Sequence, residues 1–136
     1  MTYTFTVFGK PQGKGRPRLG KNGVYTPQKT RDYEEQIRWA FRRDNRGAVP
    51  FAGSVKIAAI CYYSAPKQIT KKRLDEIRSG IVYPTVKPDL DNVLKVVADA
   101  LNGLAYVDDK QICGAYIEKR FDFEGKPRIC VEVKEV

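Results

Sequence analysis

The order of apolar and polar residues predicts four strands. Apolar side chains alternate with polar ones over residues 3–7, and a longer apolar alternation covers 55–63, where both faces could be buried. Two further strand-forming segments follow at 111–121 and 128–133. Because a short turn-like stretch, 122–127, joins these last two strands, we expect them to pair directly as an antiparallel hairpin.

Three segments have the periodicity of helices. The first begins with Thr26 as N-cap and Pro27 as the first helical residue, and it extends to about Arg43. The second, at 70–79, is short and highly charged. The third, at 92–101, has the broadest apolar stripe and is followed by an Asn-Gly pair typical of a helix end.

These elements predict an α+β fold. We expect a single domain spanning residues 1–136, with a small mixed sheet of about four strands packed against two main helices. A length of 136 residues and a hydrophobic content of 42% suit one core. No apolar run approaches the ~20 residues needed to span a membrane, and the first residues do not resemble a signal peptide. We therefore expect a cytoplasmic protein with no membrane partner.

The chain contains no histidine, which narrows its possible chemistry. Ser-His-Asp and Cys-His catalysis are excluded, and without a Cys-x-x-Cys pair a structural zinc site is not expected either. The three cysteines are widely separated and odd in number, so we expect core or half-buried thiols and no disulfide framework. Acid–base chemistry must then use carboxylates, lysine, tyrosine or metal-bound water, with no small-molecule cofactor.

Charge is distributed unevenly along the chain. The net charge is +9, which suggests a polyanionic partner. Residues 88–109 nevertheless contain five acids and one base, a net charge of −4. A metal-dependent nuclease needs this combination, because basic surface binds phosphates while carboxylates hold the cation. Uneven surface charge without function is the alternative, and composition alone does not separate the two.

A basic, glycine-rich segment covers residues 9–23. Its five glycines and two prolines argue against a regular element, so we expect a loop. Glycines let a backbone approach a ligand, and interleaved Lys and Arg suit phosphates, although a solvated basic loop is the simpler interpretation. The predicted DNA contacts are the loop cations and the lysine before the acidic segment: Lys10, Lys14, Arg16, Arg18, Lys21 and Lys87.

One polar line follows the otherwise apolar third helix. Asp91, Lys95 and Asp99 lie on it at four-residue spacing. The simpler explanation is two ion pairs, each worth about 0.3–0.5 kcal/mol. Asp89 weakens that explanation, because capping needs one acid and neighbouring carboxylates repel unless a cation lies between them. Carboxylates together with water and substrate phosphate are the usual ligands of Mg²⁺.

A second acidic pair, Asp108 and Asp109, follows this helix. The intervening turn can bring the chain back toward Asp89 and Asp91. On an extended segment the two side chains would point to opposite faces, so only one would reach a metal, and the spacing does not choose between them. In this hypothesis the cation polarises the scissile phosphate and activates a bound water. Lys95 would neutralise charge that builds on the phosphate.

Several motifs occur in a recognisable order. They are Lys-Pro-Asp-Leu-Asp-Asn-Val-Leu-Lys at 87–95, Asp-Ala-Leu-Asn-Gly at 99–103 and Asp-Asp-Lys-Gln-Ile at 108–112. Together they resemble the RusA family of Holliday-junction resolvases. Lys-Gly-Arg-Pro-Arg at 14–18 and Tyr-Thr-Pro at 25–27 resemble its phage-type and Gram-positive-type members. The likeness covers most of the chain, and the acidic motifs are its specific part.

The resemblance implies a RusA-like fold and paired, symmetric, Mg²⁺-dependent nicks in four-way DNA junctions, in recombination and repair. It implies that Asp89, Asp91 and Asp109 are the catalytic, metal-binding carboxylates and that Lys95 is the functional lysine. The resemblance, rather than the spacing, thus selects Asp109 over its neighbour. We expect Mn²⁺ to substitute for Mg²⁺. A homodimer is also implied, and it agrees with the symmetry of a junction in which two strands must be cut.

Two other functions fit the same residues. A branched-DNA-binding protein without catalytic activity would use the acids only as caps or surface charge. A metal-dependent nuclease could instead act on flaps, RNA or another structure. The residues alone do not identify a counterpart of the aromatic wedge that some family members insert into a junction.

Overall fold

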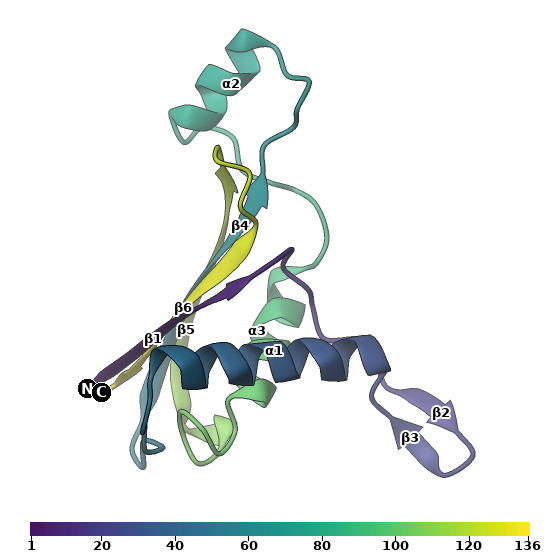
Figure 1. The fold of residues 1–136 in the computed structure, drawn as a ribbon, viewed down its shortest axis with the longest axis vertical. Helices are drawn as coiled ribbons and strands as arrows, with labels where there is room; N and C mark the ends of the chain where they lie inside the picture. Colours follow the sequence, from purple (N-terminus) through teal and green to yellow (C-terminus); the bar gives the residue numbers. More distant parts are fainter.

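Four strands form one mixed sheet. The computed structural model describes residues 1–136. The strands are β1 (Thr2–Phe8), β4 (Val55–Ser64), β5 (Ile112–Asp122) and β6 (Arg128–Glu135), and they lie in the order β1-β6-β4-β5 (Figure 1). Strand β6 pairs antiparallel with β1 and β4, whereas β4 and β5 are parallel. The predicted α+β class with a four-stranded mixed sheet is confirmed.

The predicted hairpin between the last two strands is wrong, because β4 lies between β5 and β6. Strand β4 buries Val55, Ile57 and Ala59 in the core, while its other face is half-buried or exposed. A central strand has hydrogen-bonding partners along both edges, which suits this apolar segment. Its parallel pairing with β5 requires a crossover connection, and the chain between the two strands supplies it with two helices.

Helices α1 (Gln28–Asp44) and α3 (Leu90–Ala100) pack against each other and against the sheet. Helix α1 contacts β1, and α3 contacts β5 (Figure 1). One core of 23 buried residues joins both helices to the strands. The two helices therefore fix the position of the segment that enters α3, which carries the acidic motif.

Helix α1 does not begin as predicted. Its first residue is Gln28, and Pro27 occupies the N-cap position without a side-chain cap. The Pro27 carbonyl accepts the backbone N–H groups of Thr30 and Arg31. Thr26 is therefore not the cap, because Pro27, the next residue, already accepts the first backbone hydrogen bonds of the helix.

The basic segment is not entirely irregular, contrary to expectation. Residues 9–17 have no regular structure, but β2 (Arg18–Gly20) and β3 (Gly23–Tyr25) pair as a short antiparallel hairpin. Gly23 has φ of +102°, a conformation that favours glycine and lets the chain reverse. The hairpin projects beyond the start of α1 (Figure 1).

The helix predicted at 70–79 is confirmed as α2 (Lys71–Arg78), with Thr70 as N-cap accepting the Arg73 N–H at 3.2 Å. It stands beyond one end of the sheet (Figure 1). A short 3-10 helix, η1 (Asp109–Gln111), precedes β5. No helix of the structure combines the length and apolar character that a membrane crossing requires.

All three cysteines are free thiols. Cys61 is buried and Cys130 is half-buried, as predicted, but Cys113 is exposed. The difference follows from its strand, because Cys113 lies on β5 and no residue of β5 is buried.

Truncation of the buried face of α1 should destabilise the fold strongly. Ile37 is 0% exposed, so Ile37→Ala should lower the free energy of unfolding by about 2–5 kcal/mol in urea titrations. Val24→Ala, on the exposed hairpin, is the control and should change it by about 0.5 kcal/mol or less. Equal effects of both substitutions would contradict the burial of Ile37 in the core.

Candidate active site

Two acidic side chains stand free at the start of α3. The helix begins at Leu90, two residues earlier than predicted, with Asp89 at its N-cap position. The Asp89 carboxylate makes no capping hydrogen bond, and the Asp91 carboxylate in the first turn forms neither a hydrogen bond nor an ion pair. Both residues are exposed. The positive end of the helix dipole stabilises this local negative charge in the absence of a cation.

Asp108 and Asp109 have different environments. The Asp108 carboxylate accepts the Lys110 N–H at 3.0 Å and completes a capping box with Gln111, so it is committed to holding η1. The half-buried Asp109 carboxylate has a raised pKa, first because of its side-chain hydrogen bond to Asp108 and then because of burial. The charges of Asp108 and Asp99 raise this pKa further, whereas Lys95 lowers it. Asp109 is thus the member of the pair that shares its electrostatic surroundings with Lys95.

The structure does not gather the three predicted carboxylates into one cluster. No group of three or more Asp, Glu, His or Cys side chains is arranged to hold a metal ion. Asp89 and Asp91 lie at the start of α3, while Asp109 interacts with Lys95, one helical turn beyond Asp91. The chemistry of the free pair nevertheless fits a divalent cation, since Mg²⁺ is commonly held by one or two carboxylates with water and phosphate.

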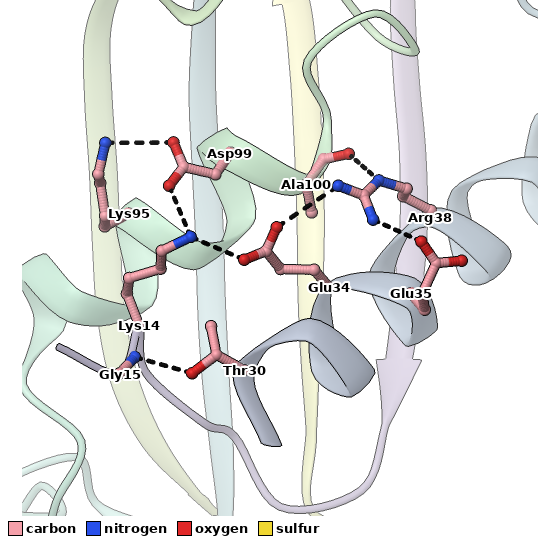
Figure 2. Close-up of polar contacts among 9 residues, drawn as sticks. All are labelled: Lys14, Gly15, Thr30, Glu34, Glu35, Arg38, Lys95, Asp99 and Ala100. Atoms are coloured by element: carbon pink, nitrogen blue, oxygen red, sulfur yellow. Dashed lines mark hydrogen bonds and ion pairs between the residues drawn. The ribbon is translucent and has the colours of Figure 1, made fainter. Parts of the chain in front are cut away.

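Lys95 belongs to a chain of ion pairs that links α3, the basic segment and α1 (Figure 2). Its ammonium lies 3.2 Å from Asp99 Oδ1, and Asp99 Oδ2 lies 3.1 Å from the Lys14 ammonium. Lys14 in turn lies 2.7 Å from Glu34 Oε1. Arg38 closes the chain through Glu34 at 3.4 Å. Of the two ion pairs in the simpler explanation, Lys95–Asp99 is therefore formed, whereas Asp91–Lys95 is not.

Lys14 is placed differently from the other predicted DNA contacts. Its side chain is only 19% exposed and points inward between α1 and α3 (Figure 2). Burial by itself lowers the pKa of the Lys14 ammonium, but the hydrogen bonds and charges of Glu34 and Asp99 outweigh it and raise the pKa. Glu34 is a buried acid that the sequence analysis missed. Its position between Tyr33 and Ile37 on α1, beside the apolar stripe, was the available signal.

A basic cleft lies beside the free carboxylates. It has a volume of about 520 Å³, no acidic side chain lines it, and Pro88 forms one of its edges immediately before Asp89. None of its cations takes part in an ion pair. The basic side chains that line the cleft are Lys10, Arg16, Arg18, Lys29 and Lys87.

The cleft brings together four of the six predicted DNA contacts and adds one. Lys29 was missed because its location in the first turn of α1 is informative only once the segment before it has folded back. Lys21 does not line the cleft and lies in the exposed turn between β2 and β3. Lys14 lies behind the cleft, in the ion-pair chain.

Two glycines set the close approach of the basic segment to the helices. A Cβ on Gly13 would lie 2.8 Å from Asn92 Cβ and 3.0 Å from Pro88 Cβ. A Cβ on Gly15 would lie 2.6 Å from Thr30 Oγ1, which accepts the Gly15 N–H at 3.0 Å. The basic segment can therefore lie directly against the start of α3 at Gly13, and against the start of α1 at Gly15, only because these positions lack side chains.

Comparison with known proteins identifies the family. Residues 9–134 match the family described as "Endodeoxyribonuclease RusA". The chain belongs to the RusA endodeoxyribonuclease family. It is also 34% identical, over 138 residues, to "Uncharacterized protein YqaN" of Bacillus subtilis (strain 168), and the match covers 97% of this chain and 95% of the relative.

The RusA assignment confirms the family that the sequence motifs indicated. The matched range contains the basic cleft, the ion-pair chain and all five acidic residues from Asp89 to Asp109. The basic cleft and the unpaired carboxylates therefore both lie within the part of the chain that matches this nuclease family.

A side chain at position 13 should displace the basic segment. Gly13→Ala should push the loop away from α3, break the hydrogen bond from the Lys14 N–H to the Asn92 carbonyl at 2.9 Å, and destabilise the protein by about 1–3 kcal/mol. Gly53→Ala is the control, because its added Cβ would meet only Glu135 Oε2 at 3.6 Å. Thermal unfolding of the two variants measures the difference, and a Gly13→Ala protein as stable as the control would refute the close packing.

Proposed function

We propose that this RusA-family chain is a Mg²⁺-dependent endodeoxyribonuclease that resolves four-way DNA junctions by paired symmetric nicks, in DNA recombination and repair. The observation that carries the proposal is the contact between a cleft of five unpaired cations and a helix start with two unpaired carboxylates. Cations that are free of ion pairs remain available to phosphates, and free carboxylates remain available to a metal ion.

Each group has a distinct task in this proposal. The cleft cations bind the DNA backbone and orient the strand past Pro88 toward the start of α3. Asp89 and Asp91 hold Mg²⁺, for which Mn²⁺ substitutes, and Asp109 contributes the third carboxylate. The bound cation would supply Lewis-acid activation of the phosphate and of a water nucleophile. Lys95, which is 58% exposed and whose charge lowers the pKa of Asp109, stabilises the additional negative charge of the phosphate as it is attacked.

Paired nicks require two active sites. One chain offers one acidic helix start, so a two-fold homodimer would present the second site to the opposite strand of a junction. A four-way DNA junction is then the proposed partner, because its two-fold symmetry matches that of the dimer.

A non-catalytic branched-DNA-binding protein is the second candidate. The observation that favours it is the separation of Asp109 from the pair at Asp89 and Asp91. A binding protein would use the same basic cleft but would not need a metal. A nuclease selective for flaps or for another branched structure is a third possibility and would keep the same chemistry.

Loss of one carboxylate should abolish cutting without abolishing binding. The wild-type protein with Mg²⁺ should nick a four-way junction faster than a flap or a linear duplex, at symmetric positions on gels of end-labelled strands. Asp91→Asn removes the charge from a proposed metal ligand and should lower the cleavage rate by about 100-fold or more, while the Kd for the junction in Ca²⁺ stays within a factor of about three.

Asp75→Asn is the matched control, because Asp75 is an exposed acid on α2, outside the acidic segment. It should cut as the wild type does. Equal cutting by Asp91→Asn, or an absence of cutting by the wild type with either Mg²⁺ or Mn²⁺, would leave the non-catalytic binding protein as the better proposal. Preferential cutting of the flap would identify a different substrate.

The basic cleft should determine the salt dependence of DNA binding. Arg16→Gln combined with Lys29→Gln should weaken junction binding and reduce the slope of log K against log salt by up to about two units, because each lost phosphate contact removes about 0.9. Arg46→Gln combined with Lys134→Gln removes the same charge from exposed positions outside the cleft and should leave most of the slope unchanged. Equal slopes for the two double variants, measured by fluorescence anisotropy, would exclude the cleft as the phosphate site.

A further inference from the structure

We propose that Lys14 is a positioning residue and not a DNA contact: it fixes Asp99, and through Asp99 it holds the Lys95 ammonium beside the reaction centre. This inference rests on the proposed function for the role of Lys95, but the placement of Lys14 is independent of it. The assignment separates Lys14 from the cations that surround it in the sequence, although all of them belong to the same basic segment.

The geometry of Asp99 carries the inference. Its two carboxylate oxygens bind two different lysines, Lys95 through Oδ1 at 3.2 Å and Lys14 through Oδ2 at 3.1 Å (Figure 2). A single ion pair between residues four apart on an exposed helix face is weak and mobile. With Oδ2 held by Lys14, the Asp99 side chain has one preferred rotation, so Oδ1 faces Lys95 in a fixed direction.

Lys14 is itself held from several sides. Its ammonium binds Glu34 at 2.7 Å, and Glu34 is 8% exposed. Withdrawal of Lys14 toward a DNA phosphate would leave the Glu34 and Asp99 carboxylates facing each other in a poorly hydrated region. The raised pKa of Lys14 agrees with a strongly bound ammonium. Lys14 is therefore committed to the protein interior, in contrast to the unpaired cations of the cleft.

The backbone at Lys14 is anchored as well as the side chain. Its N–H donates to the Asn92 carbonyl at 2.9 Å, and the next N–H, from Gly15, donates to Thr30 Oγ1 at 3.0 Å. The loop that carries Arg16 is thus tied to α3 and α1 at this point. A phosphate bound in the cleft and the ammonium of Lys95 consequently belong to one connected unit, in which Lys14 and Asp99 are the links.

A Lys14→Met variant separates the two possible roles. If Lys14 positions Lys95, the salt slope of junction binding should equal that of the wild type, while the single-turnover cleavage rate at saturating DNA should fall on the order of tenfold or more. The Lys95 side chain, followed by its ¹³Cε NMR signal in the metal-free protein, should become more mobile. Lys10→Met provides the reference for a true phosphate contact and should reduce the salt slope by about 0.9.

Two further variants complete the experiment. Asp99→Asn should reproduce the effects of Lys14→Met, and the double variant should cost little more than either single one, because both remove the same link. Lys134→Met, on β6 and outside the network, should change neither the Lys95 signal nor the cleavage rate. If Lys14→Met unfolds the protein, Glu34→Gln takes its place, since it loosens Lys14 while retaining the ammonium.

The outcomes are distinct. A salt slope for Lys14→Met that falls as it does for Lys10→Met, or a Lys95 signal unaffected by Lys14→Met and by Asp99→Asn, overturns the positioning role. A wild-type protein that does not cut DNA overturns the proposed function instead. In that case the Lys95 signal and the salt slope still decide the role of Lys14, because neither measurement depends on catalysis.

Discussion

Opposite charges must lie side by side in this protein without neutralising each other. In the proposed function the cleft needs free cations for DNA, and the start of α3 needs free carboxylates for a metal ion. An ion pair between Lys87 and Asp89, two residues apart, would disable both. The structure avoids that outcome by bringing the two regions together through uncharged contacts: Gly13 packs against Asn92, and the Lys14 N–H donates to the Asn92 carbonyl. Lys14 and Asp99 do form an ion pair, and their side chains are less exposed than the free carboxylates at the start of α3.

Most elements of the fold could be predicted from the sequence because hydrophobic periodicity is a local property. The strand order could not, because it depends on competition among strands. Residues 122–127 have the composition of a hairpin turn, yet β4 takes the central place between β5 and β6 because it is the most apolar strand. The small β2–β3 hairpin could not be predicted, because its composition of glycine and cations resembles that of a loop. The chain reverses there through the positive φ of Gly23.

The candidate site shows the same division between local and long-range information. Spacing located Asp89, Asp91 and Lys95, because all three lie within two helical turns. It could not distinguish Lys14 from the other cations of its segment, since the distinguishing partners are Glu34 on α1 and Asp99 on α3. A sequence shows which charges are present. Which of them remain unpaired is decided by tertiary packing, and that property determines which groups can bind a ligand.

The polar line on α3 has two possible explanations, internal ion pairing and a functional site. The structure contains part of both. Lys95 and Asp99 pair as a structural explanation requires, but Asp91 has no partner, and the pKa of Asp109 is raised, first by Asp108 and then by burial. An excess of carboxylates therefore remains after internal pairing is complete. The helix dipole stabilises part of this excess, and a bound cation would relieve the remaining repulsion between neighbouring carboxylates. The acids that pairing leaves over are therefore the structural argument for the proposed cation-dependent site.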